Sequence, residues 1–259
     1  MGMDFHDQKN RSSYMTRKAN QNWLKMVQKL VPITKIERAI DIGCGGGIYT
    51  KALLEMGVQS VIGIDFSEVM IEAAKENLKN YHNVTFQKGT AYDSQIKADS
   101  VDLLLERALI HHLDDLNAYF SESYRILQSK GYYLIQDRTI DDCLLPGSEE
   151  HIRGYFFELF PHLIEKESAR RYTSEQVVSA LKHANFAEIS EVQLWEVRKE
   201  YKAKDELLND IRERTGRSIL HDLTDAQLQE LVSHLDEVLP SGEAIVEKDR
   251  WTIWKAQKE

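Results

Sequence analysis

The feature that most constrains the fold is a short apolar run, residues 39–42, that passes directly into a glycine-rich segment, residues 43–47. Gly43, Gly45 and Gly47 alternate along that segment. Because glycine has no Cβ, such a loop can turn sharply and lets a ligand come close to the backbone. A helix that begins directly after the loop points its free N–H groups at a carboxylate or a phosphate. The segment therefore predicts a strand, a tight turn and a helix, with a small-molecule site at the turn.

The rest of the chain alternates between short runs rich in isoleucine and valine and longer segments with helical periodicity. This alternation is typical of an α/β fold that is built on a parallel sheet. The predicted strands are residues 38–42, 60–65, 84–88, 101–106, 132–137, 188–195 and 249–256. The helices predicted between them include residues 48–56, 67–80, 115–127 and a helix that opens at a capping box over residues 173–176.

Three segments lie outside this alternation. Residues 1–37 are predicted to form a helical cap, and residues 38–257 one domain that carries insertions at 138–172 and 201–247. Ligands bind outside the carboxyl ends of the strands in open α/β sheets. Insertions that follow the fifth and sixth strands emerge at that edge, so both are expected to act as helical lids over the site.

The side chains of the insertions favour packing over chemistry. An aromatic group over residues 155–160 is expected to pack in a core or lid, with a substrate cage as the alternative. A leucine stripe over residues 228–239 has the spacing of a buried helix face. Arg212, Arg214 and Arg217 are expected on a solvated helix face, with recognition of an anionic substrate as the alternative.

Composition excludes several classes of function. The chain has 259 residues and a formal net charge of −9, which argues against non-specific binding to nucleic acid or to an anionic membrane. It has two cysteines, as expected in a reducing cytoplasm, and no apolar stretch that approaches the ~18 residues of a membrane-spanning helix. Histidine and cysteine show no metal-ligand spacing, so no metal is expected.

The spacing of the glycines separates this loop from other nucleotide-binding loops. The dinucleotide fingerprint G-x-G-x-x-G requires a third glycine. Here that place falls on Ile48 or Thr50, and the phosphate-binding pattern that ends in Gly-Lys-Ser/Thr is also missing. A nicotinamide-dependent oxidoreductase therefore remains only as an alternative.

Two further elements support a site for a nucleoside. Asp65 ends the second predicted strand, 22 positions after Gly43, where a carboxylate can accept hydrogen bonds from both hydroxyls of a ribose. Residues 88–91, Lys-Gly-Thr-Ala, end the third strand beside the place expected for a base.

With these motifs the chain resembles the class I S-adenosylmethionine-dependent methyltransferases, and most closely their type 11 branch, which acts on small molecules. The matching segments are residues 41–47, 63–70, 89–91, 102–113, 124–131, 172–175 and 251–256. Ser129-Lys130-Gly131 departs from the Pro-Gly-Gly usual in the family, which is expected to change a turn and not the chemistry.

The resemblance implies a Rossmann-like seven-stranded sheet in the order 3-2-1-4-5-7-6, with strand 7 antiparallel and helices on both faces. It implies S-adenosyl-L-methionine as the cofactor, with Asp65 on its ribose. The methionine end would lie against Asp41, Gly43, Cys44, Gly45, Gly47 and the backbone of Arg107, and the adenine against Phe66, Met70, Gly89, Thr90 and Ala91.

Transfer of a methyl group from a sulfonium depends mainly on holding donor and nucleophile in line, and some acceptors also need a base. His111, His112 and Asp137 follow the fourth and fifth strands and are the candidate catalytic residues. For the histidines, packing or capping is favoured over a role as a base, whereas a structural ion pair and a substrate contact are equally open roles for Asp137 and Arg138. Tyr14 and Trp23 are expected to close over the cofactor.

The function predicted from the sequence is methyl transfer to a small-molecule acceptor, with the oligomeric state left open. A nucleic-acid methyltransferase is disfavoured, because those that act on exocyclic amines resemble one another in a Pro-Pro-Tyr motif and this chain has no Pro-Pro. A non-catalytic protein that only binds S-adenosylmethionine stays open as an alternative.

Overall fold

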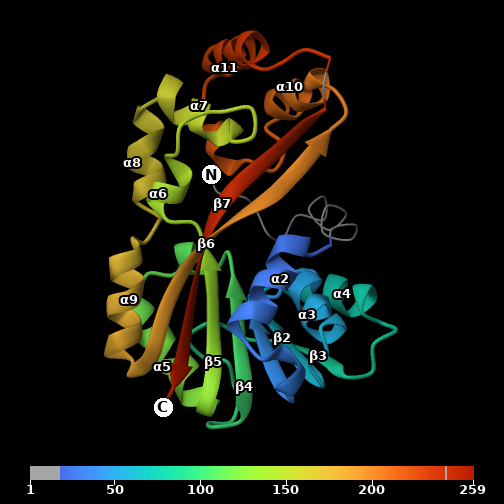
Figure 1. Ribbon diagram of the computed structural model, residues 1–259, viewed down its shortest axis with the longest axis vertical. Coiled ribbons are helices and arrows are strands. Elements are labelled where there is room, and N and C mark those ends of the chain that lie inside the picture. The colour runs from blue at the N-terminus through green and yellow to red at the C-terminus, as the bar shows by residue number, and fades with distance from the viewer. Residues whose placement is uncertain (1–17, 243) are drawn as a thin grey trace. The chain divides into compact units, whose positions relative to one another are not determined.

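The computed structural model describes residues 18–242 and 244–259, so Tyr14 and its predicted role lie outside the described residues. Its centre is one seven-stranded sheet, which Figure 1 shows with the strands running along the long axis of the view. The strands are β1 (Arg38–Ile42), β2 (Ser60–Asp65), β3 (Val84–Lys88), β4 (Val101–Arg107), β5 (Leu127–Asp137), β6 (Phe186–Tyr201) and β7 (Ile245–Lys258).

The order of the strands is β3-β2-β1-β4-β5-β7-β6, which confirms the predicted topology. The first five strands pair in parallel, with Ile40 of β1 opposite Ile62 of β2 and Leu104 of β4. β7 runs antiparallel to β5, with Ile135 opposite Trp254. The carboxyl ends of β1, β2, β4 and β5 therefore meet at one edge of the sheet, where the glycine-rich loop begins.

Helices cover both faces of the sheet (Figure 1), because their apolar sides are buried against it. α2, α3 and α4 lie on one face, and Trp23 of α2 is buried in a core with Leu53 of α3 and Leu103 of β4. α5 and α9 lie on the other face. The helices that pack on the sheet are α2 (Gln21–Leu30), α3 (Ile48–Glu55), α4 (Glu68–Asn77), α5 (Leu116–Ile126) and α9 (Ser174–His183). Two short 3-10 helices, η1 (Ile33–Lys35) and η2 (Ile110–His112), lie between these elements.

The described chain divides into two compact units. The sheet unit comprises residues 18–137, 174–194 and 252–259, and the insertion unit comprises residues 138–173 and 195–251. The insertion unit contains α6 (Ile140–Cys143), α7 (Ile152–Leu159), α8 (His162–Ser168), α10 (Lys204–Arg212), η3 (Ser218–Asp222) and α11 (Asp225–Val238).

The insertion unit has an apolar core of its own. Phe156, Phe157 and Phe160 are buried in it, as are Leu231 and Leu235 of α11. This confirms the packing role predicted for the aromatic group and the leucine stripe. A capping box is present at the start of α11, where the side chains of Thr224 and Gln227 each bond to the other's backbone N–H.

Two strands are longer than the sequence predicts, because each carries polar residues where its pattern alone indicates an end. β6 continues to Tyr201 and β7 begins at Ile245. Arg198 of β6 donates to Glu247 of β7 at 2.9 Å, and this ion pair accounts for charged residues inside both strands. β5 also begins earlier, at Leu127, with Lys130 in the left-handed region at φ +67° where the sequence departs from Pro-Gly-Gly.

Candidate functional site

The glycine-rich loop joins β1 to α3 and needs glycine at each alternate position. Gly43, Gly45 and Gly47 have φ values of +72°, +50° and +81°, in the left-handed region that side chains disfavour. The N–H groups of Gly43 and Cys44 donate to the carbonyl of Ile64 at 2.8 and 3.0 Å. The loop is thereby fixed against the carboxyl end of β2.

Asp65 binds the same loop from the end of β2. Its Oδ2 accepts from the N–H of Gly45 at 2.9 Å, and its Oδ1 accepts from the N–H of Ser67, also at 2.9 Å. The residue is buried, at 8% exposure. Its carboxylate therefore sets the distance between the loop and the start of α4.

Asp41 lies beneath the loop on β1 and is almost fully buried. Its Oδ2 accepts from Oγ1 of Thr50 on α3 at 2.6 Å. Burial raises the pKa of Asp41 to about 7. The hydrogen bond from Thr50 opposes this rise, and the nearby charge of Asp65 adds to it. Two acidic side chains thus lie close together at the loop, a charge pattern that a cationic ligand would stabilise.

The residues predicted to border the adenine follow β2 and β3, the strands next to β1 in the sheet. Phe66 is half-exposed at 50%, whereas Met70 and Ala91 are buried. Gly89 donates to the carbonyl of Asp65 at 3.1 Å, and Thr90 accepts from the N–H of Asp93 at 3.1 Å.

Cys44 is a buried residue of the loop. Burial raises the pKa of its thiol, so the sulfur is neutral near pH 7. A Cβ added to Gly63 would lie 3.0 Å from the sulfur, so the side chain of Cys44 fills the space beside β2.

Arg107 ends β4 and is held by neighbours at the same edge. Its Nε donates to Oε1 of Gln136 at 3.1 Å, and its guanidinium lies 4.4 Å from the ring centre of Tyr49. Tyr49 in turn packs edge-on against Trp23, with ring centres 4.7 Å apart. The N-terminal helix α2 thus reaches the edge of the site through two aromatic rings.

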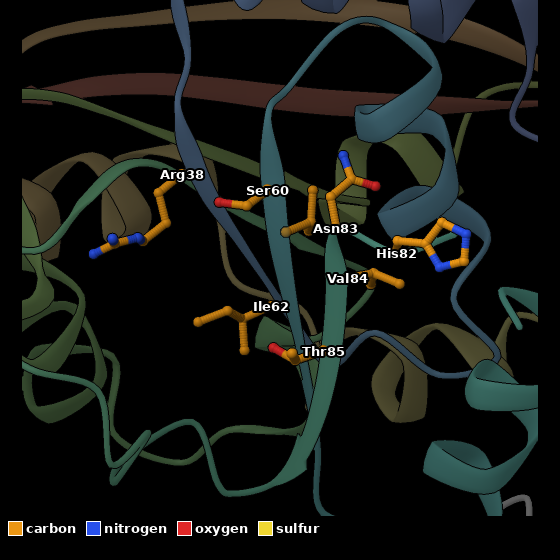
Figure 2. A pocket seen from close by; sticks show the side chains of 8 residues that line it. Arg38, Ser60, Ile62, His82, Asn83, Val84 and Thr85 are labelled. Carbon is orange, nitrogen blue, oxygen red and sulfur yellow. The ribbon is translucent and has the colours of Figure 1, made fainter. Parts of the chain in front are cut away.

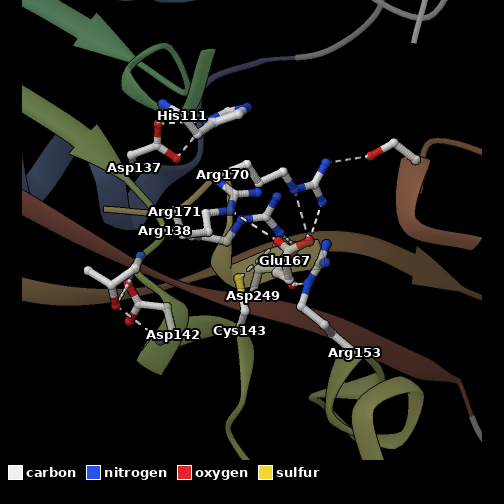
Figure 3. Close-up of polar contacts among 12 residues, drawn as sticks. His111, Asp137, Arg138, Asp142, Cys143, Arg153, Glu167, Arg170, Arg171 and Asp249 are labelled. Carbon is white, nitrogen blue, oxygen red and sulfur yellow. Dashed lines mark hydrogen bonds and ion pairs between the residues drawn. The ribbon is translucent and has the colours of Figure 1, made fainter. Parts of the chain in front are cut away.

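His111 and Asp137 form a close pair, which Figure 3 shows on neighbouring elements. Nδ1 of His111 lies 2.7 Å from Oδ2 of Asp137, and the backbone N–H of His111 donates to the same oxygen at 3.3 Å. The side chains are 12% and 1% exposed, respectively. The ring of His112 lies 4.0 Å from that of His111, centre to centre, so both rings stay together beside the carboxylate.

Glu106 is a residue of this edge that the sequence analysis missed. It is 1% exposed, and burial raises its pKa to about 8; the charge of Asp137 adds to this rise, whereas the hydroxyls of Tyr119 and Tyr133 oppose it. Its environment is set by Tyr119 of α5 and Tyr133 of β5, so the pattern of β4 alone, which also contains Asp102 and Arg107, could not indicate it.

Arg138 belongs to the insertion unit, where Nη1 donates to Oδ2 of Asp249 at 3.1 Å. Figure 3 shows this pair among several arginines. The expected solvated face of Arg212, Arg214 and Arg217 is wrong for Arg217, which is buried and donates to Glu247 at 2.6 Å. Its partner lies 30 positions further along the chain, so local periodicity could not indicate it.

A cavity of about 280 Å³ lies at the opposite edge of the sheet, lined by the first residues of β1, β2 and β3 (Figure 2). Arg38, His82 and Asn83 are among its lining residues. The glycine loop and the His111–Asp137 pair are at the other ends of the strands, so this cavity is separate from the candidate site.

Within residues 18–242 and 244–259, no group of three or more histidine, cysteine, aspartate or glutamate side chains could hold a metal ion. None of the helices described in these residues combines the length and the apolar character that a membrane span requires.

The comparisons with known proteins agree with this geometry. Residues 40–135, which run from β1 through β5, match the methyltransferase domain family. This part of the chain is a methyltransferase domain. It contains Asp41, the glycine loop, Asp65, Arg107 and His111.

Two curated relatives match part of the chain. The uncharacterized methyltransferase YcgJ of Bacillus subtilis is 33% identical over 118 residues, 44% of this chain and 46% of that protein. The demethylmenaquinone methyltransferase of Listeria welshimeri is 26% identical over 154 residues, 58% of this chain and 64% of that protein. The chain thus matches about half to two thirds of the length of these relatives.

Among solved structures, one of phosphoethanolamine N-methyltransferase 2 from Haemonchus contortus in complex with S-adenosyl-L-methionine superposes with a TM-score of 0.59. It is 21% identical and covers 99% of this chain and 60% of that one. This likeness shows that the methyltransferase domain has the same fold.

Proposed function

We propose that the protein is an S-adenosylmethionine-dependent methyltransferase that acts on a small-molecule acceptor. The observation that carries the proposal is the contact between Gly45 and Asp65, which holds the glycine loop against the end of β2. The methyltransferase domain family and the S-adenosylmethionine complex of a protein with this fold support it.

The residues at the loop fit this cofactor. A Cβ at Gly45 would meet no atom within 4 Å, so the loop leaves open space on the side of that residue. The raised pKa of Asp41 would return toward its ordinary value if an ammonium group lay nearby, as the amino group of a methionine would. Half-exposed Phe66 offers an aromatic face to a flat base.

We assign the remaining cofactor contacts as the sequence predicts. Asp65 would bind the ribose, exchanging or sharing its bond to the N–H of Gly45. Phe66, Met70 and residues 89–91 would border the adenine, and the methionine end would lie against residues 43–47 and the backbone of Arg107.

S-adenosylmethionine supplies a methyl group that its sulfonium has already activated, so the chain's own task is chiefly to orient and to exclude water. His111 would take a proton from an acceptor at Nε2, because Asp137 holds its Nδ1. His112 would keep the ring of His111 in place by packing against it.

The nature of the acceptor is also a proposal. A small molecule is favoured by the relative named for demethylmenaquinone and by a net charge of −9, which disfavours nucleic acid. The lid role of the two insertions and a cytoplasmic location stay predictions from the sequence.

Isothermal titration of the full chain with S-adenosylmethionine, S-adenosylhomocysteine and NADH tests the proposal. Micromolar binding of the first two ligands with no heat from NADH is the expected result. Binding of NADH alone would overturn it and assign the glycine loop to an oxidoreductase. Binding without turnover in a broad acceptor screen would instead favour a non-catalytic role.

A further inference from the structure

Glu106 places a carboxyl group in the layer between the sheet and α5 (Figure 1). Leu105, the residue before it on β4, is buried in the core that Trp23 of α2 shares, on the other face of the sheet. Adjacent side chains of a strand point to opposite faces, so Glu106 points toward α5. Both of its carboxyl oxygens are buried without a hydrogen-bond partner among the described residues. Burial of this kind disfavours the charged form of a carboxyl group.

The groups that face Glu106 come from three elements. α5 contributes Tyr119, and β5 contributes Tyr133 and Asp137. β1 contributes the apolar Ile42, which lies opposite Glu106 in the sheet. Burial raises the pKa of both phenols above the ordinary value, so both are neutral near pH 7. The charge on Asp137 therefore faces Glu106 and disfavours a second negative charge beside it.

Asp137 connects Glu106 to the candidate base. Its Oδ2 lies 2.7 Å from Nδ1 of His111, so one carboxylate faces the imidazole and the Glu106 carboxyl group together. The guanidinium of Arg107, the next residue of β4, lies 4.4 Å from the ring centre of Tyr49 on α3, on the other face of the sheet. A charge on Glu106 would thus act on His111 through Asp137.

The protonation state of Glu106 affects how tightly His111 holds a proton. A base must begin the reaction without the proton that it is to accept. A second carboxylate beneath Asp137 would stabilise the imidazolium, and His111 would then be occupied by a proton more often. Burial raises the pKa of Glu106 to about 8, and the charge of Asp137 adds to the rise, although the phenols of Tyr119 and Tyr133 oppose it. The carboxyl group is therefore mostly neutral at pH 7.

We propose that Glu106 is a positioning residue that acts on His111 through Asp137. As a neutral acid it leaves Asp137 as the charge that orients the imidazole, and when it ionises it adds a second charge that makes His111 more basic. The inference rests on the proposed function for the role of His111 as a base. The electrostatic coupling of the three residues can be measured without cofactor or acceptor.

The test follows the ring of His111 by NMR in the full chain labelled with carbon-13 histidine, from pH 5 to pH 10. The spectrum of His111→Gln assigns the signal. Besides the titration of the ring itself, the native chain is expected to show a step near pH 8, where Glu106 ionises. Absence of this step from the native chain would overturn the proposal.

Two variants assign the step to Glu106. Glu106→Gln, which keeps the shape of the side chain and cannot ionise, is expected to lose it. Asp102→Asn is the matched control and is expected to keep it, because Asp102 lies at the other end of β4, where it accepts from the N–H of Arg38 at 2.7 Å. A step that persists in Glu106→Gln, or one that both variants lose, would contradict the assignment.

Tyr119→Phe gives a result that packing alone would not. The hydroxyl of Tyr119 opposes the rise in the pKa of Glu106, and its removal leaves the aromatic ring in place. The step in the His111 signal is therefore expected to move to higher pH in this variant. A step that stays in place or moves to lower pH would overturn the proposal.

The dependence of kcat on pH gives a second measurement once an acceptor has been found. The native enzyme is expected to show an inflection near pH 8 that Glu106→Gln lacks, with KM for S-adenosylmethionine unchanged. An inflection that both enzymes share would contradict the proposal. Titration with S-adenosylhomocysteine keeps the two proposals apart, because a failure to bind would remove the proposed function and leave the NMR coupling standing. A missing NMR step in a chain that binds this ligand would remove the present inference alone.

Discussion

Nδ1 of His111 lies 2.7 Å from Oδ2 of Asp137, although the two residues are 26 positions apart in the sequence. They meet because η2 follows β4 while Asp137 ends the neighbouring strand β5. The carboxylate is 1% exposed and so is shielded from water, which strengthens its hold on the imidazole. The pair is therefore the most direct test of a chemical role at this edge.

Asp137→Asn is expected to lower kcat by about 10²–10⁴-fold for an acceptor that must lose a proton, because the amide no longer favours the required tautomer. Binding of S-adenosylmethionine should not change. Both quantities can be measured once an acceptor has been found by screening. His112→Gln is expected to lower kcat less than Asp137→Asn does, because it removes the ring that packs against His111 and leaves the carboxylate of Asp137 in place. Full activity of Asp137→Asn would show that the acceptor needs no base here.

Asp65→Ala is expected to weaken binding of S-adenosylmethionine by ~1–3 kcal/mol, through the loss of charged hydrogen bonds to the ribose. Part of the effect would come from the loop, because the N–H of Gly45 loses its acceptor. Titration calorimetry measures the change. Asp99→Ala serves as the control, since the side chain of this aspartate is 68% exposed and pairs with Lys258. An unchanged affinity of Asp65→Ala for S-adenosylmethionine would contradict the assignment of Asp65 to the ribose.

Gly45→Val is expected to abolish cofactor binding by filling the open side of the loop. A φ of +50° also strains any residue with a side chain, by about 1–2 kcal/mol, so a modest loss of stability is expected as well. Gly242→Val reproduces the strain without the site, because Gly242 has a φ of +84° and also meets no atom within 4 Å. Equal affinity for S-adenosylmethionine in the two variants would exclude the loop as the binding site.

Glu106→Gln tests the buried carboxyl group beneath the pair. Its pKa is raised from 4.5 to about 8 by burial, so the folded state holds the proton more tightly than the unfolded state does. This stabilisation is complete below pH 4.5 and is lost as the pH rises through 8. The free energy of unfolding is measured in urea at pH 5, 7 and 9. As the pH increases, the value for the native chain should fall relative to the value for Glu106→Gln. A constant difference would mean that the carboxyl group is ionised throughout.

Local sequence was enough to predict the sheet and the loop. β1, β2 and β3 have the predicted bounds, because each strand is directly followed by a glycine or ends at an aspartate that breaks its pattern. The glycines at 43, 45 and 47 predicted a tight turn, and all three adopt positive φ values there.

Contacts between distant residues could not be predicted in this way. The pairing of Arg198 with Glu247 spans 49 positions and hides two charges inside strands, so both strands appeared to be shorter. Glu106 appeared to be the end of an apolar strand, although its environment is set by Tyr119 on a later helix. The sequence contains these residues but not their neighbours in space.

The place of β7 between β5 and β6 has a consequence for the order of assembly. Among the strands of the described residues, β6 pairs only with β7, which begins more than 40 positions after β6 ends. During synthesis β6 must therefore wait, with an unpaired edge, until the residues from Ile245 onward have left the ribosome. The loop closure that precedes this pairing is long and entropically costly, so insertion of β7 is expected to be a slow step of folding. A chain that is released before that point would expose two open strand edges, of β5 and of β6, to other proteins.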